Sequence, residues 1–208
     1  MLLYCIRHGE SAFNAEGRIQ GHLNVPLSEL GRRQGEALAQ TLAGLPIRAV
    51  YSSPLARALD TAEPIARALG LDVQVEPELI EIRVGIFQGN RRDELERIYP
   101  AEFARWKSGD PDFVIPGGES RRELMRRGTA AIRAIAARTH DRVVVVSHGA
   151  ILAAALKTLL EIPARRNPFL LENASISRVE IDGDLVRLHS LNQVDHLREV
   201  GLAGGGDL

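Results

Sequence analysis

The stretch LLYCIRHGE at residues 2–10 is an apolar run that ends in arginine, histidine and glycine, and VVVVSHGA at residues 143–150 repeats that ending. Each apolar run has the length of a buried strand and is rich in aliphatic or aromatic side chains. Each is followed at once by His-Gly and then by a pattern typical of a helix. In an open α/β sheet, ligands bind at the carboxyl ends of the parallel strands. We therefore expect His8 and His148 to face one another across one site.

The composition is that of an ordinary globular protein. The chain has 208 residues, of which 45% are hydrophobic and 25% are charged, so we expect a single domain over residues 1–208 with a sizeable core. The formal net charge of −1 gives no reason to expect a nucleic acid or an anionic membrane as a partner. Cys5 is the only cysteine, which excludes an intrachain disulfide and favours a cytoplasmic location. No apolar run approaches the length of a membrane span.

Strand patterns and helix patterns alternate along most of the chain. Strands are expected over residues 2–6, 47–51, 71–75 and 143–146, and helices over residues 31–43, 54–69, 120–138 and 150–160. Ser28 is a suitable N-cap for the first of these helices, and Pro54 is expected in the first turn of the second. This alternation predicts an α/β fold, namely a three-layer α/β/α sandwich around a mostly parallel sheet.

Three segments lie outside this alternation. The tripeptide Asp-Gly-Asp at residues 182–184 separates two alternating apolar runs, which predicts a hairpin at one edge of the sheet. Residues 76–118 are strongly charged and less regular, and we expect them to form a small cap insertion with short helices over the carboxyl edge of the sheet. The glycine-rich residues 203–208 are expected to be a frayed tail.

A few polar side chains stand where they could carry chemistry. His8 can act as a nucleophile, a base or a ligand, whereas Arg7 beside it suits a phosphate or a carboxylate. Arg57 can point back toward His8 and add positive charge, although an exposed helix arginine is, taken alone, the commoner interpretation. Glu81 in an apolar stretch could be a general acid, although a surface-facing strand glutamate is commoner. His148 could stabilise charge on a transferring phosphoryl group.

Other common kinds of active site lack their sequence signals. The six histidines show no spacing of three or four residues, and there is no cysteine pair, so a metal site is not expected. There is no Gly-x-Ser-x-Gly elbow for a serine nucleophile. Neither of the two common glycine-rich phosphate-binding loops of nucleotide sites is present.

Seven short motifs occur in the order that one family would place them. They are Arg-His-Gly-Glu-Ser at 7–11 with Phe-Asn at 13–14, Gln-Gly at 20–21, LSELGRRQ at 27–34, YSSPLARA at 51–58, Leu-x-Glu at 79–81 with Gly85 and Gly89, Pro-Gly-Gly-Glu-Ser at 116–120 and Ser-His-Gly at 147–149. In these motifs, which cover most of the chain, the protein resembles the histidine phosphatase superfamily, also called the phosphoglycerate-mutase-like family.

This resemblance implies a division of labour among the residues of the motifs. His8 would attack phosphorus and become a phosphohistidine, and Glu81 would protonate the leaving oxygen and later deprotonate the attacking water. Asn14 would assist at the phosphate, and the resemblance implies that substrate or phosphate is bound by Arg7, Asn14, Gln20, Gly21, Arg57, His148 and Gly149. Neither a metal nor an organic cofactor is implied, and the partner would be a small phosphorylated metabolite.

Two branches of the family are compatible with these motifs. The mutase branch often has Gln-Gly where residues 88–89 read Gln-Gly, but it also places an arginine directly after the acid, where this chain has Ile82. Mutases are typically longer and have a larger cap. We therefore expect a cytoplasmic, histidine acid phosphatase-type phosphomonoesterase that hydrolyses small phosphomonoesters. The alternatives are a cofactor-dependent phosphoglycerate mutase and a catalytically weak, phosphate-dependent regulatory protein. The edge hairpin also makes a homodimer plausible.

Overall fold

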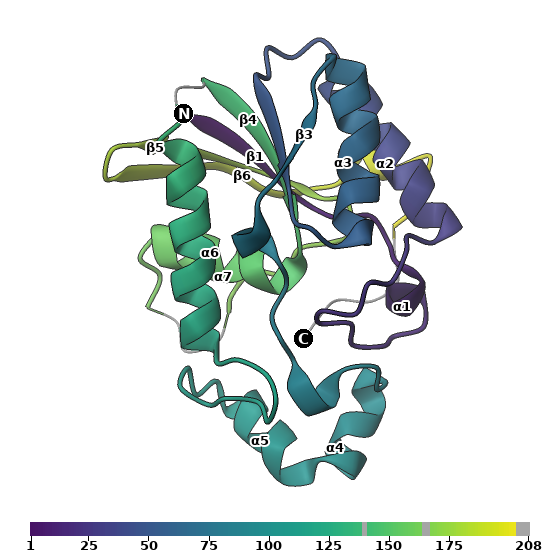
Figure 1. The fold of residues 1–208 in the computed structure, drawn as a ribbon, viewed down its shortest axis with the longest axis vertical. Helices are drawn as coiled ribbons and strands as arrows, with labels where there is room; N and C mark the ends of the chain where they lie inside the picture. The colour runs from purple at the N-terminus through teal and green to yellow at the C-terminus, as the bar shows by residue number, and fades with distance from the viewer. Residues whose placement is uncertain (139–140, 164–166, 203–208) are drawn as a thin grey trace.

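A six-stranded sheet forms the centre of the computed structural model, which describes residues 1–138, 141–163 and 167–202 (Figure 1). Its strands are β1 (Leu2–Arg7), β2 (Ala49–Ser52), β3 (Val73–Val75), β4 (Arg142–Ser147), β5 (Ile176–Asp182) and β6 (Leu185–Gln193), in the order β3-β2-β4-β1-β5-β6. Strands β3, β2, β4 and β1 are parallel, whereas β5 and β6 are antiparallel and form a hairpin at one edge. The predicted α/β fold, with a mostly parallel sheet and an edge hairpin, is confirmed.

Helices cover both faces of this sheet. Helices α2 (Glu29–Leu42) and α3 (Ala56–Leu69) pack on one face, and α6 (Arg121–Ala136) and α7 (Gly149–Leu159) pack on the other (Figure 1). Side chains alternate between the faces: Leu3 and Cys5 of β1 join the cluster under α6 and α7, while Tyr4 and Ile6 join the opposite cluster. Because the central strands are buried on both faces, they read as continuous apolar runs.

Helices α2 and α3 begin in different ways, because α2 has a side-chain cap from its own N-cap residue and α3 does not. Ser28 is the N-cap of α2 and its hydroxyl accepts a hydrogen bond from the Gly31 amide at 3.0 Å. The expectation that Pro54 lies in the first turn of α3 is wrong, because Leu55 is still extended and serves as the N-cap. The first helical amide, that of Ala56, donates to Asn24 Oδ1 at 2.7 Å. The chain is thus anchored to a distant loop before the helix begins.

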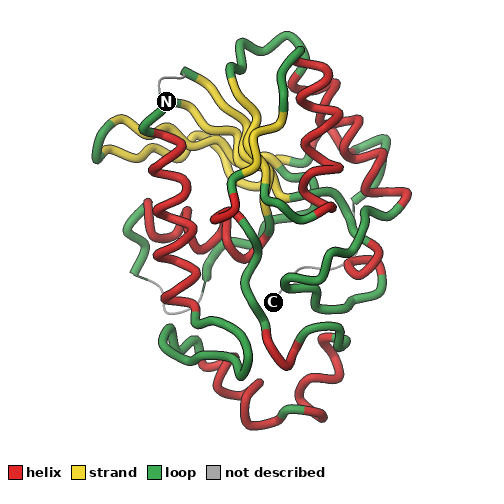
Figure 2. Tube along the Cα trace, viewed as in Figure 1, coloured by secondary structure: helices red, strands yellow, loops and turns green. Residues whose placement is uncertain are grey.

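The cap lies beyond the carboxyl ends of the parallel strands (Figure 2). It contains the short helices α4 (Leu95–Ile98) and α5 (Pro100–Ser108) and the 3-10 turns η2 (Gly85–Phe87) and η3 (Arg92–Glu94). Its apolar cluster, which includes Phe87, Leu95 and Trp106, also contains Ile151 of α7, so the cap packs directly on the main body. The segment before it, with η1 (Pro77–Leu79), belongs to the main core through Leu79.

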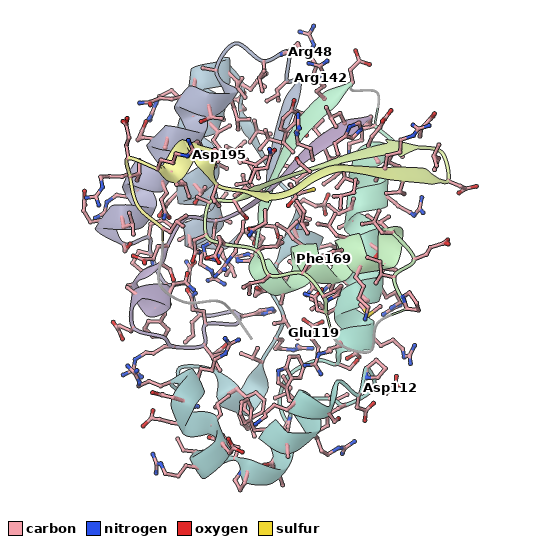
Figure 3. All side chains as sticks on the ribbon, turned by 180° about the vertical axis from the view of Figure 1, so that it is seen from behind. Arg48, Asp112, Glu119, Arg142, Phe169 and Asp195 are labelled. Carbon is pink, nitrogen blue, oxygen red and sulfur yellow. The ribbon has the colours of Figure 1, made fainter. Side chains whose placement is uncertain are left out.

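The remaining short elements are α1 (Ala12–Ala15) after β1 and η4 (Asp195–Leu197) after the hairpin. Arg48 and Arg142 lie at the end of the sheet opposite the cap, which carries Asp112 (Figure 3). Within the described ranges, no helix combines the length and the apolar character that a membrane crossing needs. The expected frayed tail at 203–208 lies outside the described residues. The homodimer stays a prediction.

Candidate active site

The carboxyl ends of β1 and β4 are neighbours, and they bring the two histidines together. Arg7 pairs with Ser147 in the parallel ladder, and the His8 amide donates to the Ser147 carbonyl at 2.9 Å. The imidazole rings of His8 and His148 lie edge to face, with centroids 5.1 Å apart and planes inclined by 64°. Two segments 140 residues apart in sequence therefore meet at one point of the sheet edge.

The hydrogen bonds of His8 determine which of its nitrogens is nucleophilic. Nδ1 lies 2.6 Å from the carbonyl oxygen of Gly9. Because a carbonyl only accepts, Nδ1 carries the proton and Nε2 keeps its lone pair. The Nε–H of Arg57 donates to this Nε2 at 3.2 Å. The lone pair of Nε2 thus faces a cationic group, which is where an anionic electrophile would be held.

Two buried guanidinium groups supply the positive charge. Arg57, the second residue of α3, is only 1% exposed, so the alternative of an exposed helix arginine is wrong. Its two terminal nitrogens donate to the carbonyls of Leu23 at 2.8 Å and Gly21 at 2.9 Å. Arg7 is equally buried and donates to the Leu171 carbonyl at 2.5 Å. Their planar, fixed groups suit the oxygens of a phosphate.

The surroundings of His148 favour the neutral form of its imidazole. It is fully buried as the N-cap residue of α7, and its Nε2 lies 2.7 Å from the Ser53 hydroxyl. Burial, followed by the positive charge of Arg57, holds the pKa of His148 well below its usual range. A neutral ring can donate one N–H to a phosphoryl oxygen without adding a further buried positive charge to those of Arg7 and Arg57. Gly149 follows as the first residue of α7.

Glu81 is buried at the amino end of α7. Its carboxyl group accepts hydrogen bonds from the amides of Ile82 at 2.8 Å, Ala150 at 3.1 Å and Ile151 at 3.1 Å. Its exposure is only 5%, so the alternative of a surface-facing strand glutamate is wrong. The amino end of a helix is a favourable place for a carboxylate, because its backbone amides are otherwise unpaired.

The backbone of the Glu81 segment is held by residues from distant elements. Arg127 of α6 donates to the carbonyls of Ile80 at 2.7 Å and Glu81 at 3.3 Å, and it pairs with Glu119 at 2.9 Å. His22 Nε2 donates to the Glu81 carbonyl at 2.7 Å. The sequence interpretation missed Arg127 and His22, because neither stands in a recognisable local pattern.

One pocket collects most of the predicted site residues. His8, Asn14, Gln20, Gly21, Arg57 and Glu81 all line it. The other predicted residues, Arg7, His148 and Gly149, are buried but do not line it. At Gly21 the backbone φ is +51°, and a Cβ atom there would lie 2.5 Å from Val84, so glycine is required by both conformation and space.

Asn173 is a further buried residue that the sequence interpretation missed. Its Nδ2 donates to the carbonyls of His8 at 3.0 Å and Gly9 at 3.3 Å and to Asn14 Oδ1 at 3.2 Å. No local sequence signal marks it, because its place follows from the register of β5 in the folded sheet, which pairs Ile176 with Ile6 of β1. Continuing this antiparallel register places the residues before Ile176 beside His8.

The described residues give no support for a metal site or for a cysteine nucleophile. Among the residues that the structure describes, no three His, Cys, Asp or Glu side chains are grouped so as to hold a metal ion. Burial raises the pKa of the Cys5 thiol to about 12, so this cysteine stays protonated and is not a nucleophile.

Comparisons with known proteins agree with this geometry. A family model described as the histidine phosphatase superfamily (branch 1) matches residues 3–194. A relative from Cronobacter sakazakii named probable phosphoglycerate mutase GpmB is 39% identical over 180 residues, which cover 86% of this chain and 84% of the relative. The structure of a mycobacterial glucosyl-3-phosphoglycerate phosphatase superposes with a TM-score of 0.84 at 32% identity, covering 93% of this chain and 99% of the other. A phosphoserine phosphatase from Entamoeba histolytica superposes with a TM-score of 0.84 at 30% identity, covering 94% and 98%.

Proposed function

Since the chain belongs to branch 1 of the histidine phosphatase superfamily, we propose that it is a metal-independent phosphatase that hydrolyses small phosphomonoesters through a phosphohistidine on His8. The observation that carries this proposal is the state of the His8 ring. Its Nδ1 is tied to a carbonyl, and its Nε2 lone pair faces Arg57 in the same pocket that Glu81 lines.

In the first step, Nε2 of His8 attacks phosphorus while the bond from phosphorus to the ester oxygen breaks. The departing oxygen takes a proton from the carboxyl group of Glu81, which becomes a carboxylate. Arg7, Arg57 and the neutral His148 donate hydrogen bonds to the phosphoryl oxygens, and their charge and geometry are in place before the reaction. Asn14, Gln20, Gly21 and Gly149 complete the binding site.

In the second step, water attacks the phosphohistidine. Glu81 takes a proton from this water as its oxygen bonds to phosphorus, and the bond from phosphorus to Nε2 breaks. The products are inorganic phosphate and the neutral, Nδ1-protonated His8 from which the cycle began. Glu81 is again protonated, so protons and charges balance over the two steps.

The residue after Glu81 favours hydrolysis over phosphoryl transfer between substrates. In the mutase branch that this chain resembles, an arginine at this position holds the substrate carboxylate. Here the position is Ile82, which is 2% exposed and packs in the apolar cluster of the cap. The solved structures named above are phosphatases of glucosyl-3-phosphoglycerate and of phosphoserine, which also favours hydrolysis.

A phosphoglycerate mutase is the second candidate, because the Cronobacter sakazakii relative carries that name. One experiment separates the two. Phosphate release is measured from a panel of small phosphomonoesters in the presence of a chelator, and 3-phosphoglycerate is incubated in parallel with and without a bisphosphoglycerate primer. We expect primer-independent phosphate release that the chelator does not inhibit. Primer-dependent isomerisation without phosphate release would establish the mutase instead.

The role of Glu81 has its own test. We expect Glu81→Gln to slow hydrolysis of alkyl phosphates far more than hydrolysis of aryl phosphates with activated leaving groups, because only poor leaving groups need a proton. Equal losses on both classes of ester would contradict the assignment of Glu81 as the acid.

A further inference from the structure

A second pocket adjoins the catalytic one on the side from which the alcohol product would leave. It lies between the cap, the first turn of α6 and one face of α7. The two pockets share Ile82 and Ala150 as lining residues. A substrate whose phosphoryl group sits at His8 could therefore extend its alcohol portion into this second space.

One face of α7 connects the acid to the far end of this second pocket. Ala150, Ala154 and Lys157 are four and three residues apart, so they share a face of the helix, and all three line the pocket. The two alanines leave open space along this face. Glu81 stands at its near end, since the Ala150 amide donates to its carboxyl group, and Lys157 stands at its far end.

Lys157 is a buried cation without a counterion among the residues that the structure describes. It is only 7% exposed, and among the described residues no carboxylate lies within 4.0 Å of its ammonium group and no acceptor hydrogen-bonds to it. Burial, and then the charge of Arg121, lowers the pKa of Lys157. Arg121 is held rigidly beside the pocket, with its guanidinium 3.4 Å from the Trp106 ring centroid and one nitrogen 2.8 Å from the Trp106 carbonyl. A buried, uncompensated charge is costly, and a bound anion would offset that cost.

The acidic residues on the same wall do not cancel this charge. Asp110 pairs with Arg105 at 3.4 Å, and Asp112 is paired with Arg122 through two hydrogen bonds. Both carboxylates are thus already matched by arginines. The positive charge that no described carboxylate matches is that of Lys157.

We propose that this second pocket is a distal subsite that binds a second anionic group, a carboxylate or a phosphate, on the alcohol portion of the substrate, with Lys157 as its main contact. The proposal rests on the proposed function, because it needs the phosphoryl group to sit at His8. It narrows the substrate class to phosphomonoesters with two separated anionic groups.

The helix sets the spacing between these two groups. Seven residues from Ala150 to Lys157 correspond to about 10 Å of helix rise, and a long side chain leans back toward the amino end of its helix. The ammonium group should therefore lie roughly 6 to 10 Å from the Glu81 carboxyl group. An extended chain gains about 3.5 Å for every three covalent bonds along it. A substrate that spans this distance therefore has roughly five to eight bonds between its ester oxygen and an oxygen of its second anionic group. Three-carbon acid phosphates, with four bonds from ester oxygen to carboxylate oxygen, are too short to reach.

The test compares synthetic esters that differ only in their tails. The probes are 6-phosphooxyhexanoate, its uncharged counterpart hexyl phosphate, the bisphosphate of 1,6-hexanediol and the short 3-phosphooxypropanoate. We expect wild-type kcat/KM to be about tenfold or more higher for 6-phosphooxyhexanoate or the bisphosphate than for hexyl phosphate, with no such gain for the short acid. Which of the two long anions is preferred identifies the anionic group.

Substitution of the lysine then tests its part in this preference. Lys157→Met keeps the length and apolar stem of the side chain but removes its charge, so the preference for the charged tail should fall to about one. The matched control is Lys107→Met, which removes a cap lysine that already pairs with Glu96 at 3.6 Å and should keep the preference. Hydrolysis of all four esters at equal efficiency by the wild type would overturn the subsite while leaving the phosphatase intact. Failure to hydrolyse any of them would overturn the proposed function itself.

Discussion

The ends of β1 and β4 share a local sequence pattern but hold different parts of the site. Both strands have six residues, the same burial pattern and a histidine followed by glycine directly after their last residue. At the last paired position, β1 carries Arg7, whose buried guanidinium donates to the Leu171 carbonyl and, in the proposed mechanism, also binds a phosphoryl oxygen. The equivalent residue of β4 is Ser147, whose hydroxyl donates to the Leu79 carbonyl at 2.6 Å and so holds the segment that leads to Glu81.

The two histidines differ for the same reason. After β1 the chain turns through Gly9, and the Gly9 carbonyl fixes the proton of His8 on Nδ1. After β4 the chain enters α7 at once, so His148 is buried as an N-cap residue while the next amides bind Glu81. One strand end therefore presents a nucleophile, and the other aligns an acid and supplies a neutral donor. A shared motif predicts where a side chain lies, but its neighbours determine what it can do.

The strongest test of this division is the loss of each imidazole in turn. We expect His8→Ala to lower phosphate release by more than about a thousandfold and to abolish the phosphohistidine, because His8 forms the covalent bond in the proposed mechanism. Turnover and mass spectrometry of acid-quenched enzyme measure the two effects. His189→Ala is the control, since His189 pairs with Glu180 on the edge hairpin and should retain wild-type turnover. Residual activity above a thousandth of wild type would exclude His8 as the nucleophile.

Removal of the second imidazole should slow the reaction without preventing it. We expect His148→Ala to lower kcat by about a hundredfold to a thousandfold, the usual cost of removing one hydrogen-bond donor to a developing negative charge. The phosphohistidine on His8 should still be trapped, only more slowly. His148→Asn keeps a buried donor and should lose less activity. If His148→Ala abolished labelling as completely as His8→Ala, the two histidines would not have the separate roles inferred here.

The neutrality of His148 should also appear in the pH dependence of stability. Its pKa is held well below the usual value near 6.5 in the folded protein, so the unfolded chain binds the proton first as the pH falls. The contribution to stability is therefore complete above about pH 6.5 and is lost as the pH falls below it, by at most about 1.4 kcal/mol per pH unit.

The measurement is the free energy of unfolding of wild type and His148→Asn between pH 7 and pH 5. Burial also lowers the pKa of His22 and His196, so both proteins should lose stability on acidification. The wild type should lose more, and the difference between the two curves isolates His148. Parallel curves would mean that folding does not lower the pKa of His148.

The positions of His8 and His148 at the ends of two strands could be predicted from the sequence, because the patterns that indicate them are local. An apolar run followed by His-Gly and a helix pattern places a histidine at the carboxyl edge of the sheet, and the motif around Arg57 places its guanidinium in the first turn of the next helix. The predicted residues His8, Arg57 and Glu81 line one pocket as a consequence. The mostly parallel sheet and the edge hairpin followed from equally local alternation and turn chemistry, whereas the order of the strands was not predicted.

The residues that hold the backbone around Glu81 and His8 could not be predicted from local patterns. The Glu81 segment has no regular periodicity, and its position depends on Arg127, which lies 46 residues further along the chain. Asn173 reaches His8 across 165 residues, through a register that only the folded sheet defines. Pro54 was placed wrongly because proline is common in the first turn of helices, whereas here the following Leu55 is still extended and α3 begins at Ala56.

The smallest expected effect tests whether Ser53 positions His148. Its hydroxyl lies 2.7 Å from Nε2, in a motif whose arginine was recognised but whose serine was assigned no role. We expect Ser53→Ala to lower kcat about threefold to tenfold, because the ring keeps its place but loses one buried hydrogen bond of about 1 kcal/mol. Ser52→Ala is the matched control, since within the described part of the chain that buried hydroxyl hydrogen-bonds to the Ser53 carbonyl and not to the imidazole. In the His148→Ala background, Ser53→Ala should have no further effect on kcat, because the serine acts through the ring that has been removed. If the losses in kcat were additive in the double variant, Ser53 would act independently of His148. The hydrogen bond between Ser53 and His148 would then not be part of what distinguishes the end of β4 from the end of β1.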